Sequence, residues 1–235
     1  MWDTDRDQFV PGQWFHGQMY PERCDLSPDG KLFVYFGGKF RDRDVDKGYE
    51  RTWIAVSRPP YWTALALWPM GDTWGGEAVF LDSRTVRLET SSSSYGARHH
   101  PDHPPGPLQV FESYKLSVYD PRKTAVACCR SGWQRASAGA WRKARKGFML
   151  ETSRGDFGGT DPSLYSLSVD DGKLLAAFRA NWADWDQSGR LVATAGGRVL
   201  EGWFTQARGL IWRQLAAMNE EKPEPIESPE WAQRW

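Results

Sequence analysis

Residues 24–35, CDLSPDGKLFVY, decide the fold that the sequence predicts. A short apolar run leads into SPDG at residues 27–30, and a denser apolar run follows. Serine, proline and aspartate favour a tight turn, and Gly30 supplies a positive φ, so two strands joined by a turn are expected. The arrangement returns in residues 182–194, WADWDQSGRLVAT, with Gly189 in the turn. A hairpin repeated at a distance indicates a repetitive all-β architecture.

Other pairs of apolar runs predict more hairpins of the same kind. These hairpins span residues 51–68, 77–90, 108–129 and 164–178. Residues 133–152 fit a weaker repeat, in which residues 142–147 are expected to be a connection between strands. Residues 210–217 fit a final strand or a helix, because leucine, alanine and glutamine are also good helix formers.

The segment 163–202 resembles one period of a WD40-like or TolB-like β-propeller. In it a strand ends in DDGK, an apolar pair precedes DQSGR, and LVATAG follows. The SPDGK of residues 27–31 is similar to the same position in another blade. The Gly-His and closing Trp-Asp dipeptides of true WD40 repeats are missing, so the resemblance implies an architecture and no functional residues. The chain, particularly residues 51–76, is also similar to a family of bacterial proteins, which implies no activity.

The predicted fold is all-β. It is a small β-propeller-like domain of four antiparallel blades, with five as the alternative, and it spans residues 19–218. Residues 1–18 are expected to form an N-terminal arm or a closing strand. Residues 219–235 are acidic and contain three prolines, so an extended C-terminal tail is expected there, either lying over the domain or docking elsewhere. The 14 tryptophans suit the spaces between blades, since each large ring buries much area.

Composition limits the classes of protein to which the chain could belong. Thirty basic and 30 acidic residues give zero net charge, which argues against a whole-molecule attraction to nucleic acid or to an anionic membrane. Three cysteines without metal-type spacing favour reduced thiols. The N-terminal sequence is polar and acidic, and no apolar stretch approaches 18 residues, so neither a secretory leader nor a membrane span is expected. A cytoplasmic protein is predicted.

Histidines gather in a predicted loop at residues 91–107. His99, His100 and His103 lie beside Asp102, and imidazole with carboxylate is a ligand set for zinc or another divalent metal. Two adjacent histidines cannot easily reach one ion, so a surface loop is the preferred interpretation. A metal-dependent enzyme at this loop is kept as the second alternative, and no cofactor is predicted.

Basic residues dominate residues 121–150, which contain no acidic side chain. The basic side chains and the tryptophans between them are Arg122, Lys123, Arg130, Trp133, Arg135, Trp141, Arg142, Lys143, Arg145 and Lys146. Guanidinium groups beside exposed aromatic rings can bind phosphates and stack on bases. Neutralisation of this stretch in the fold by acidic residues, for example those of the tail, is the preferred interpretation. Binding at these residues is kept as a prediction, with an acidic protein preferred over nucleic acid.

The sequence gives little support for a catalytic function. Adjacent Cys128 and Cys129 lie in an expected strand, where a buried cysteine is usually a small apolar filler. No nucleophile elbow, zinc-protease motif, phosphate loop or dinucleotide fingerprint occurs. The sequence therefore favours a non-enzymatic platform that binds a protein partner, as a subunit or accessory of a larger bacterial assembly. A nucleic-acid-binding accessory using residues 122–146 is the first alternative, and the oligomeric state is left open.

Overall fold

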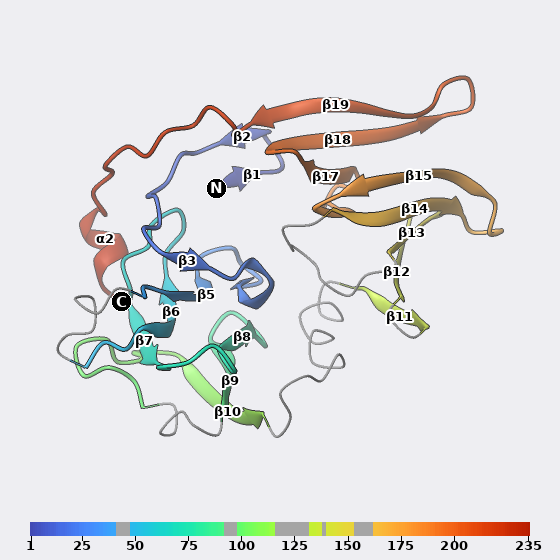
Figure 1. Cartoon of the computed structure of the whole chain (residues 1–235). Helices are drawn as coiled ribbons and strands as arrows, with labels where there is room; N and C mark the ends of the chain where they lie inside the picture. The colour runs from blue at the N-terminus through green and yellow to red at the C-terminus, as the bar shows by residue number, and fades with distance from the viewer. Residues whose placement is uncertain (41–47, 92–97, 116–131, 138–139, 153–161) are drawn as a thin grey trace. The chain divides into compact units, whose positions relative to one another are not determined.

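The computed structural model describes residues 1–40, 48–91, 98–115, 132–137, 140–152 and 162–235 (Figure 1). Contacts divide the chain into two compact units. Unit 1 contains Met1, Pro11–Asp120 and Pro223–Trp235, and unit 2 contains Trp2–Val10 and Pro121–Lys222. Unit 1 thus includes the C-terminal segment Pro223–Trp235, and unit 2 includes the N-terminal segment Trp2–Val10. The predicted domain of residues 19–218 stays a prediction, since contacts do not show which parts fold independently.

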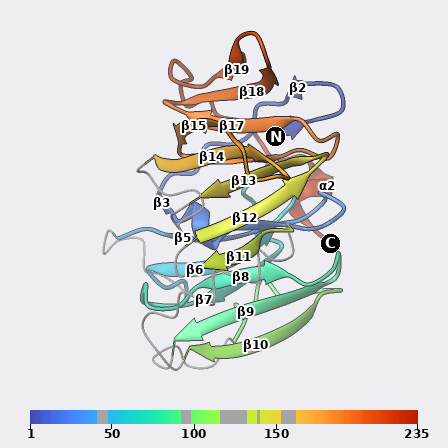
Figure 2. The same ribbon diagram turned by 90° about the vertical axis from the view of Figure 1, so that its right-hand side faces the viewer.

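Unit 1 consists of strands with two short helical turns. Its elements are β3 (Gln18–Met19), η1 (Pro21–Arg23), β4 (Asp25–Leu26), β5 (Phe33–Gly38), β6 (Thr52–Ser57), β7 (Ala66–Pro69), β8 (Glu77–Phe80), β9 (Thr85–Ser91), β10 (Gln109–Lys115) and α2 (Glu230–Gln233). One antiparallel sheet has the order β3-β5-β6-β7, with β4 also paired to β5. A second sheet has the order β8-β9-β10, seen as neighbouring strands in Figure 2.

The hairpin predicted at residues 24–35 is confirmed. Gly30 has a φ of 70° and donates its N–H to the Ser27 carbonyl at 2.8 Å, which closes the turn. The Ser27 hydroxyl accepts the N–H of Leu32 at 2.9 Å and donates to the Asp29 carboxylate at 2.7 Å. The turn residues therefore satisfy one another, and the strands that follow start in a fixed register.

Alternation along β5 gives the first sheet two buried faces. Val34 and Phe36 pack with residues of β8 and β9 in the main core of unit 1, and both are 0% exposed. Tyr35 points to the other face and belongs to a separate aromatic cluster. Burying each of these large side chains contributes about 1.5–3 kcal/mol, so both faces stabilise the sheet. The side chains of this stretch therefore divide between two faces, and the candidate site lies on the face of Tyr35.

Unit 2 contains longer strands, including the long hairpin of its last two strands (Figure 1). Its elements are β1 (Trp2–Asp3), β2 (Gln8–Phe9), β11 (Gln134–Ser137), β12 (Ala140–Arg145), β13 (Phe148–Thr152), β14 (Ser163–Val169), β15 (Leu174–Ala180), β16 (Trp182–Trp185), β17 (Leu191–Ala195), β18 (Arg198–Thr205) and β19 (Gly209–Ala217). Strands β11 to β15 form one antiparallel sheet in chain order, and β16 to β19 form another. Their facing side chains, among them Leu150, Leu167 and Leu191, form the core of unit 2.

Most of the predicted strands are confirmed, one open alternative is decided, and one expectation is corrected. Residues 210–217 lie in a strand and not in a helix, because β19 pairs with β18 along its whole length. Residues 142–147 are not a simple connection, since β12 runs to Arg145 and pairs with β13. Three residues of this strand are basic and only Trp141 is buried, so the strand lacks a clear apolar alternation in the sequence.

The all-β class is confirmed, and the pairing is antiparallel except at β9 and β10. These two strands are parallel, with Val110 opposite Val86, where only antiparallel pairing was expected. Residues 116–129 of the hairpin predicted at residues 108–129 lie outside the described residues. Among the residues that the structure does describe, no sheet closes on itself. In the same ranges, no helix combines the length and apolar character that crossing a membrane requires.

Arg190 attaches the N-terminal segment Trp2–Val10 to unit 2. Its guanidinium donates to the Asp7 carboxylate at 2.8 and 2.9 Å, to the Thr4 carbonyl at 2.8 Å and to the Asp186 carboxylate at 2.7 Å. The Trp2 ring centroid lies 5.9 Å from the guanidinium carbon. Two carboxylates in a forked arrangement bind arginine more strongly than a single surface ion pair does, so this residue fixes the predicted N-terminal arm.

Candidate functional site

An aromatic cluster covers the face of β5, β6 and β7 that lies opposite the main core of unit 1. Tyr35, Ala55 and Leu67 are its buried members. The Tyr35 ring contacts Trp62 edge to face at 5.1 Å between centroids, and its hydroxyl donates to the Trp62 carbonyl at 3.0 Å. Burial raises the pKa of Tyr35, so this hydroxyl remains a donor.

Phe15 closes one end of this cluster, and glycine in β5 makes room for it. Phe15 lies 5.4 Å from the Trp62 ring and 6.1 Å from the Trp53 ring, measured between centroids. A Cβ at Gly37 would lie 2.8 Å from the Phe15 ring, which is too close for a carbon contact. Glycine at this position therefore lets the segment after Pro11 pack directly on the strand.

Two adjoining pockets open over the cluster. The tail pocket has a volume of about 500 Å³ and is lined by Gln13, Trp14, His16, Trp62, Thr63, Pro223, Glu224, Pro225 and Ile226. The tyrosine pocket has a volume of about 450 Å³ and is lined by Trp14, Phe15, His16, Tyr35, Lys39, Tyr49, Trp53, Trp62, Ala64, Leu67 and His103. Trp14, His16 and Trp62 belong to both pockets. The two pockets are therefore called together the aromatic groove. Its size and aromatic lining are typical of binding sites.

Tyr49 and His103 form the polar end of the tyrosine pocket, and the buried His100 packs against Tyr49. The Tyr49 ring stacks on His100 at 4.0 Å between centroids, and its hydroxyl lies 2.9 Å from the Nε2 atom of His103. The His100 N–H donates to the Leu67 carbonyl at 2.7 Å, and the Leu67 N–H donates to the His103 carbonyl at 3.1 Å. These backbone bonds hold the two histidines against the edge of β7.

Burial also shifts the protonation of this polar end. It lowers the pKa of His103, and the neighbouring His100 lowers that pKa further. Burial raises the pKa of the Tyr49 hydroxyl. Both groups are therefore uncharged near neutral pH and can each donate or accept a hydrogen bond.

The C-terminal segment Pro223–Trp235 lies along the groove as an extended chain that ends in α2. The Gln13 amide donates to the Ile226 carbonyl at 2.7 Å, while its oxygen accepts the Trp62 N–H at 2.7 Å. The Ser228 hydroxyl bonds the hydroxyl of Thr63. Of the two alternatives for the tail, the structure shows the first for this segment, which lies over unit 1.

The last residues of the tail anchor it more firmly. Ala232 is 0% exposed, and the Trp231 ring meets Tyr61 edge to face at 5.5 Å. The Trp235 indole donates to the Pro104 carbonyl at 3.2 Å. Pro223 to Pro225 lack comparable anchors among the described hydrogen bonds, so the tail is held from Ile226 onwards and crosses the tail pocket before that point.

The predicted histidine group is brought together only in part. His100 and His103 are 5.6 Å apart between ring centroids, whereas His99 is exposed. The Nδ1 atom of His100 accepts the N–H of Asp102 at 3.2 Å. Among the described residues, no group of three or more His, Cys, Asp or Glu side chains could hold a metal ion. A metal-dependent enzyme at this loop stays an untested prediction.

The predicted basic stretch is distributed over the β11–β12 hairpin and the turn after it. Arg122, Lys123 and Arg130 lie outside the described residues, as do Cys128 and Cys129. Arg135 and Arg142 are exposed on neighbouring strands. The side chains of Arg145 and Lys146 donate to the carbonyls of Gln187 and Ser188, so these two cations fasten a turn.

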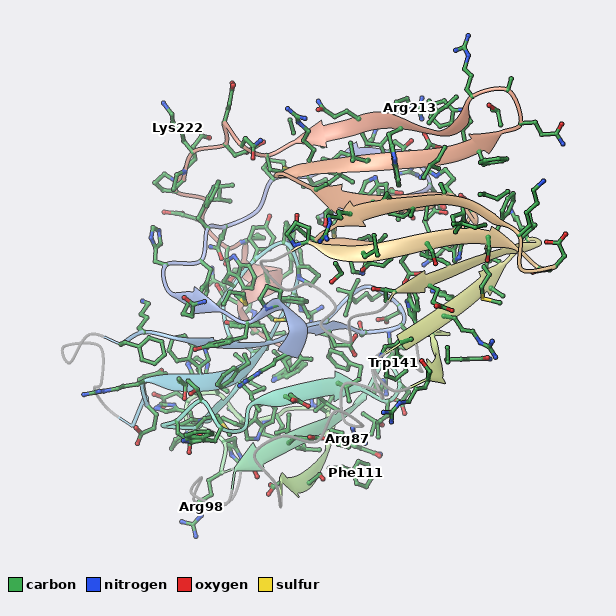
Figure 3. All side chains as sticks on the ribbon, turned by 45° about the vertical axis from the view of Figure 1, so that its right-hand side comes forward. Arg87, Arg98, Phe111, Trp141, Arg213 and Lys222 are labelled. Atoms are coloured by element: carbon green, nitrogen blue, oxygen red, sulfur yellow. The ribbon has the colours of Figure 1, made fainter. Side chains whose placement is uncertain are left out.

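Inside unit 2, the compensating acid for this stretch is Asp184. The Lys143 Nζ lies 2.7 Å from its carboxylate, and the Trp133 indole donates to the same group at 3.1 Å. Trp133 and Trp141, the latter labelled in Figure 3, are 2% and 4% exposed and belong to the core. The interleaved tryptophans are thus buried, and binding by the stretch stays a prediction that rests on its exposed arginines.

No known protein family, no curated protein and no solved structure matches this chain. Its function is therefore inferred from the geometry of its own residues. The aromatic groove could not be predicted from the sequence, because its members come from six separate segments: 13–16, 35–39, 49–53, 62–67, residue 103 and 223–226. The high tryptophan content and the proline-containing tail were the available signals.

Proposed function

We propose that the protein is a non-enzymatic platform that binds a partner protein, and that the aromatic groove holds an extended segment of this partner. The observation that carries the proposal is the chain's own segment Pro223–Ile226, which lies along the groove in extended form. Aromatic-lined grooves bind extended, proline-containing peptides, because such peptides lose little conformational freedom on binding.

The lining supports binding more than catalysis. The polar groups of the groove are few, and Tyr49 and His103 are already paired with each other. Aromatic side chains supply large contact areas at small entropic cost, as in known binding surfaces. A role within a larger bacterial assembly and a cytoplasmic location remain parts of the proposal.

The β-propeller-like arrangement is also proposed. The described residues form four sheets of three or more strands, which agrees with the number of blades in the main prediction. In the sheet at residues 182–217, strands β16 to β19 follow one another closely in the sequence and pair in chain order, as in propeller blades. A closed ring of these sheets would be tested by an experimental structure of the whole chain.

A peptide display library, panned against the purified full-length protein, tests the binding function. We expect selected peptides to bind the wild type and to lose most of their affinity for Trp14→Ala. Trp74→Ala is the matched control, because Trp74 is also exposed in unit 1 and lines neither pocket of the groove. Failure to select any peptide, or equal binding to both variants, would remove the proposal.

A further inference from the structure

The tail pocket has two unlike walls. One wall is aromatic, with Trp14 and Trp62, and the other is the chain's own Pro223–Ile226 segment. A volume of about 500 Å³ lies between them, so the tail crosses the pocket without filling it. This space is large enough for a long side chain and the backbone on either side of it.

The tail wall carries negative charge. Segment Pro223–Trp235 contains three glutamates and one arginine, and Arg234 is paired with Glu230 at 3.0 Å. Glu224 and Glu227 are both exposed, but only Glu224 lines the pocket. The tail therefore contributes one carboxylate to a pocket that is also lined by two tryptophans.

We infer that the tail pocket binds an arginine side chain of the partner's extended segment. A guanidinium group stacks on tryptophan faces through cation–π attraction, and it pairs with a carboxylate through directed hydrogen bonds. Trp14 and Trp62 supply the faces, and Glu224 supplies the carboxylate. This inference rests on the proposed function and specifies which partner chemistry the groove selects.

The other pocket gives the bound segment a direction. Lys39 lines the tyrosine pocket and Glu224 lines the tail pocket, so the two ends of the groove differ in charge. A segment with its arginine beside Glu224 places its neighbouring carbonyl or carboxylate groups towards Lys39. An acidic segment in the tail pocket would instead face the carboxylate of Glu224.

Three labelled pentapeptides with the sequences APRPA, APQPA and APEPA test the inference, with binding to the full-length protein measured by fluorescence anisotropy. We expect APRPA to bind about 5-fold more tightly than APQPA, and APEPA to bind most weakly, from the cation–π and carboxylate contacts. Glu224→Gln should reduce the preference for arginine about 2- to 5-fold. Glu227→Gln is the matched control, since it removes the same charge from the same tail.

The outcomes separate this inference from the proposed function. Equal binding of the three peptides, or equal effects of Glu224→Gln and Glu227→Gln, would overturn the arginine site while leaving a groove that binds peptides. If Trp14→Ala does not weaken the binding of any peptide, or if no peptide binds the wild type, both proposals fail. Tighter binding of APRPA that depends on Glu224 and Trp14 supports both.

Discussion

Replacing Lys143 by methionine should destabilise unit 2 strongly. The Lys143 ammonium is 2.7 Å from the Asp184 carboxylate, and their side chains are only 15% and 11% exposed. Methionine fills a similar volume but leaves Asp184 as a buried charge without its cation. Removing one partner of a buried ion pair typically costs about 3–5 kcal/mol. Hydrogen bonds from Trp133 and from the Trp185 N–H to Asp184 remain. We therefore expect a loss near the lower end, about 3 kcal/mol.

Urea denaturation followed by circular dichroism measures this loss. The double variant Lys143→Met with Asp184→Asn should recover at least half of it, because no buried charge is then left unpaired. Arg142→Met is the matched control: Arg142 precedes Lys143 in β12 but is exposed, so its replacement should change the free energy of unfolding by less than about 0.5 kcal/mol. A loss below about 1 kcal/mol for Lys143→Met would refute the reasoning that the ion pair is buried and structural.

Three further predictions follow from contacts within single units. Burial raises the pKa of Asp186, but hydrogen bonds from Arg190 outweigh burial and hold that pKa below its usual value of 3.8. Unit 2 should therefore lose stability as the pH falls below about 4. Asp186→Asn should make the free energy of unfolding depend less on pH, as measured by denaturation at pH 3 and pH 5. Gly37→Val should displace Phe15 and lower the free energy of unfolding by about 1–3 kcal/mol. An unchanged free energy of unfolding would mean that the strand accommodates the side chain and that glycine is not required there. Gln13→Glu keeps an acceptor for the backbone N–H of Trp62 but removes the donor to the Ile226 carbonyl, so proteolysis of the tail should become faster than in wild type. An unchanged rate of proteolysis would count against tail docking.

Local features of the sequence predicted the hairpins because their causes are local. The SPDG turn at residues 27–30 and the alternation around Tyr35 each act within a few residues, and the structure confirms both. The parallel pairing of β9 and β10 has no such signal, since a connection of 17 residues, 92–108, separates the two strands. The pairing of strands joined by tight turns can therefore be predicted from the sequence, whereas the pairing of strands joined by long connections cannot.

The candidate site could not be predicted for a related reason. Gln13, Trp62, His103 and Ile226 meet in unit 1, although the sequence separates the first and last by 213 positions. No periodic pattern of residues in the sequence indicates that segments so far apart come into contact. In the basic stretch, the carboxylate that pairs with Lys143 belongs to Asp184, which lies far along the chain. The partner of a charged side chain is therefore not apparent from its neighbours in the sequence.

The exchange of end segments between the units has a consequence for the order of folding. During synthesis, Gln13 leaves the ribosome long before Ile226 exists, and Asp7 leaves long before Arg190. Neither unit can make all of its contacts until the opposite end of the sequence has been translated, and closing such long loops carries an entropic cost. The nascent chain therefore has Trp14 and Trp62 in place long before residues 223–226, which complete the tail pocket, are synthesised.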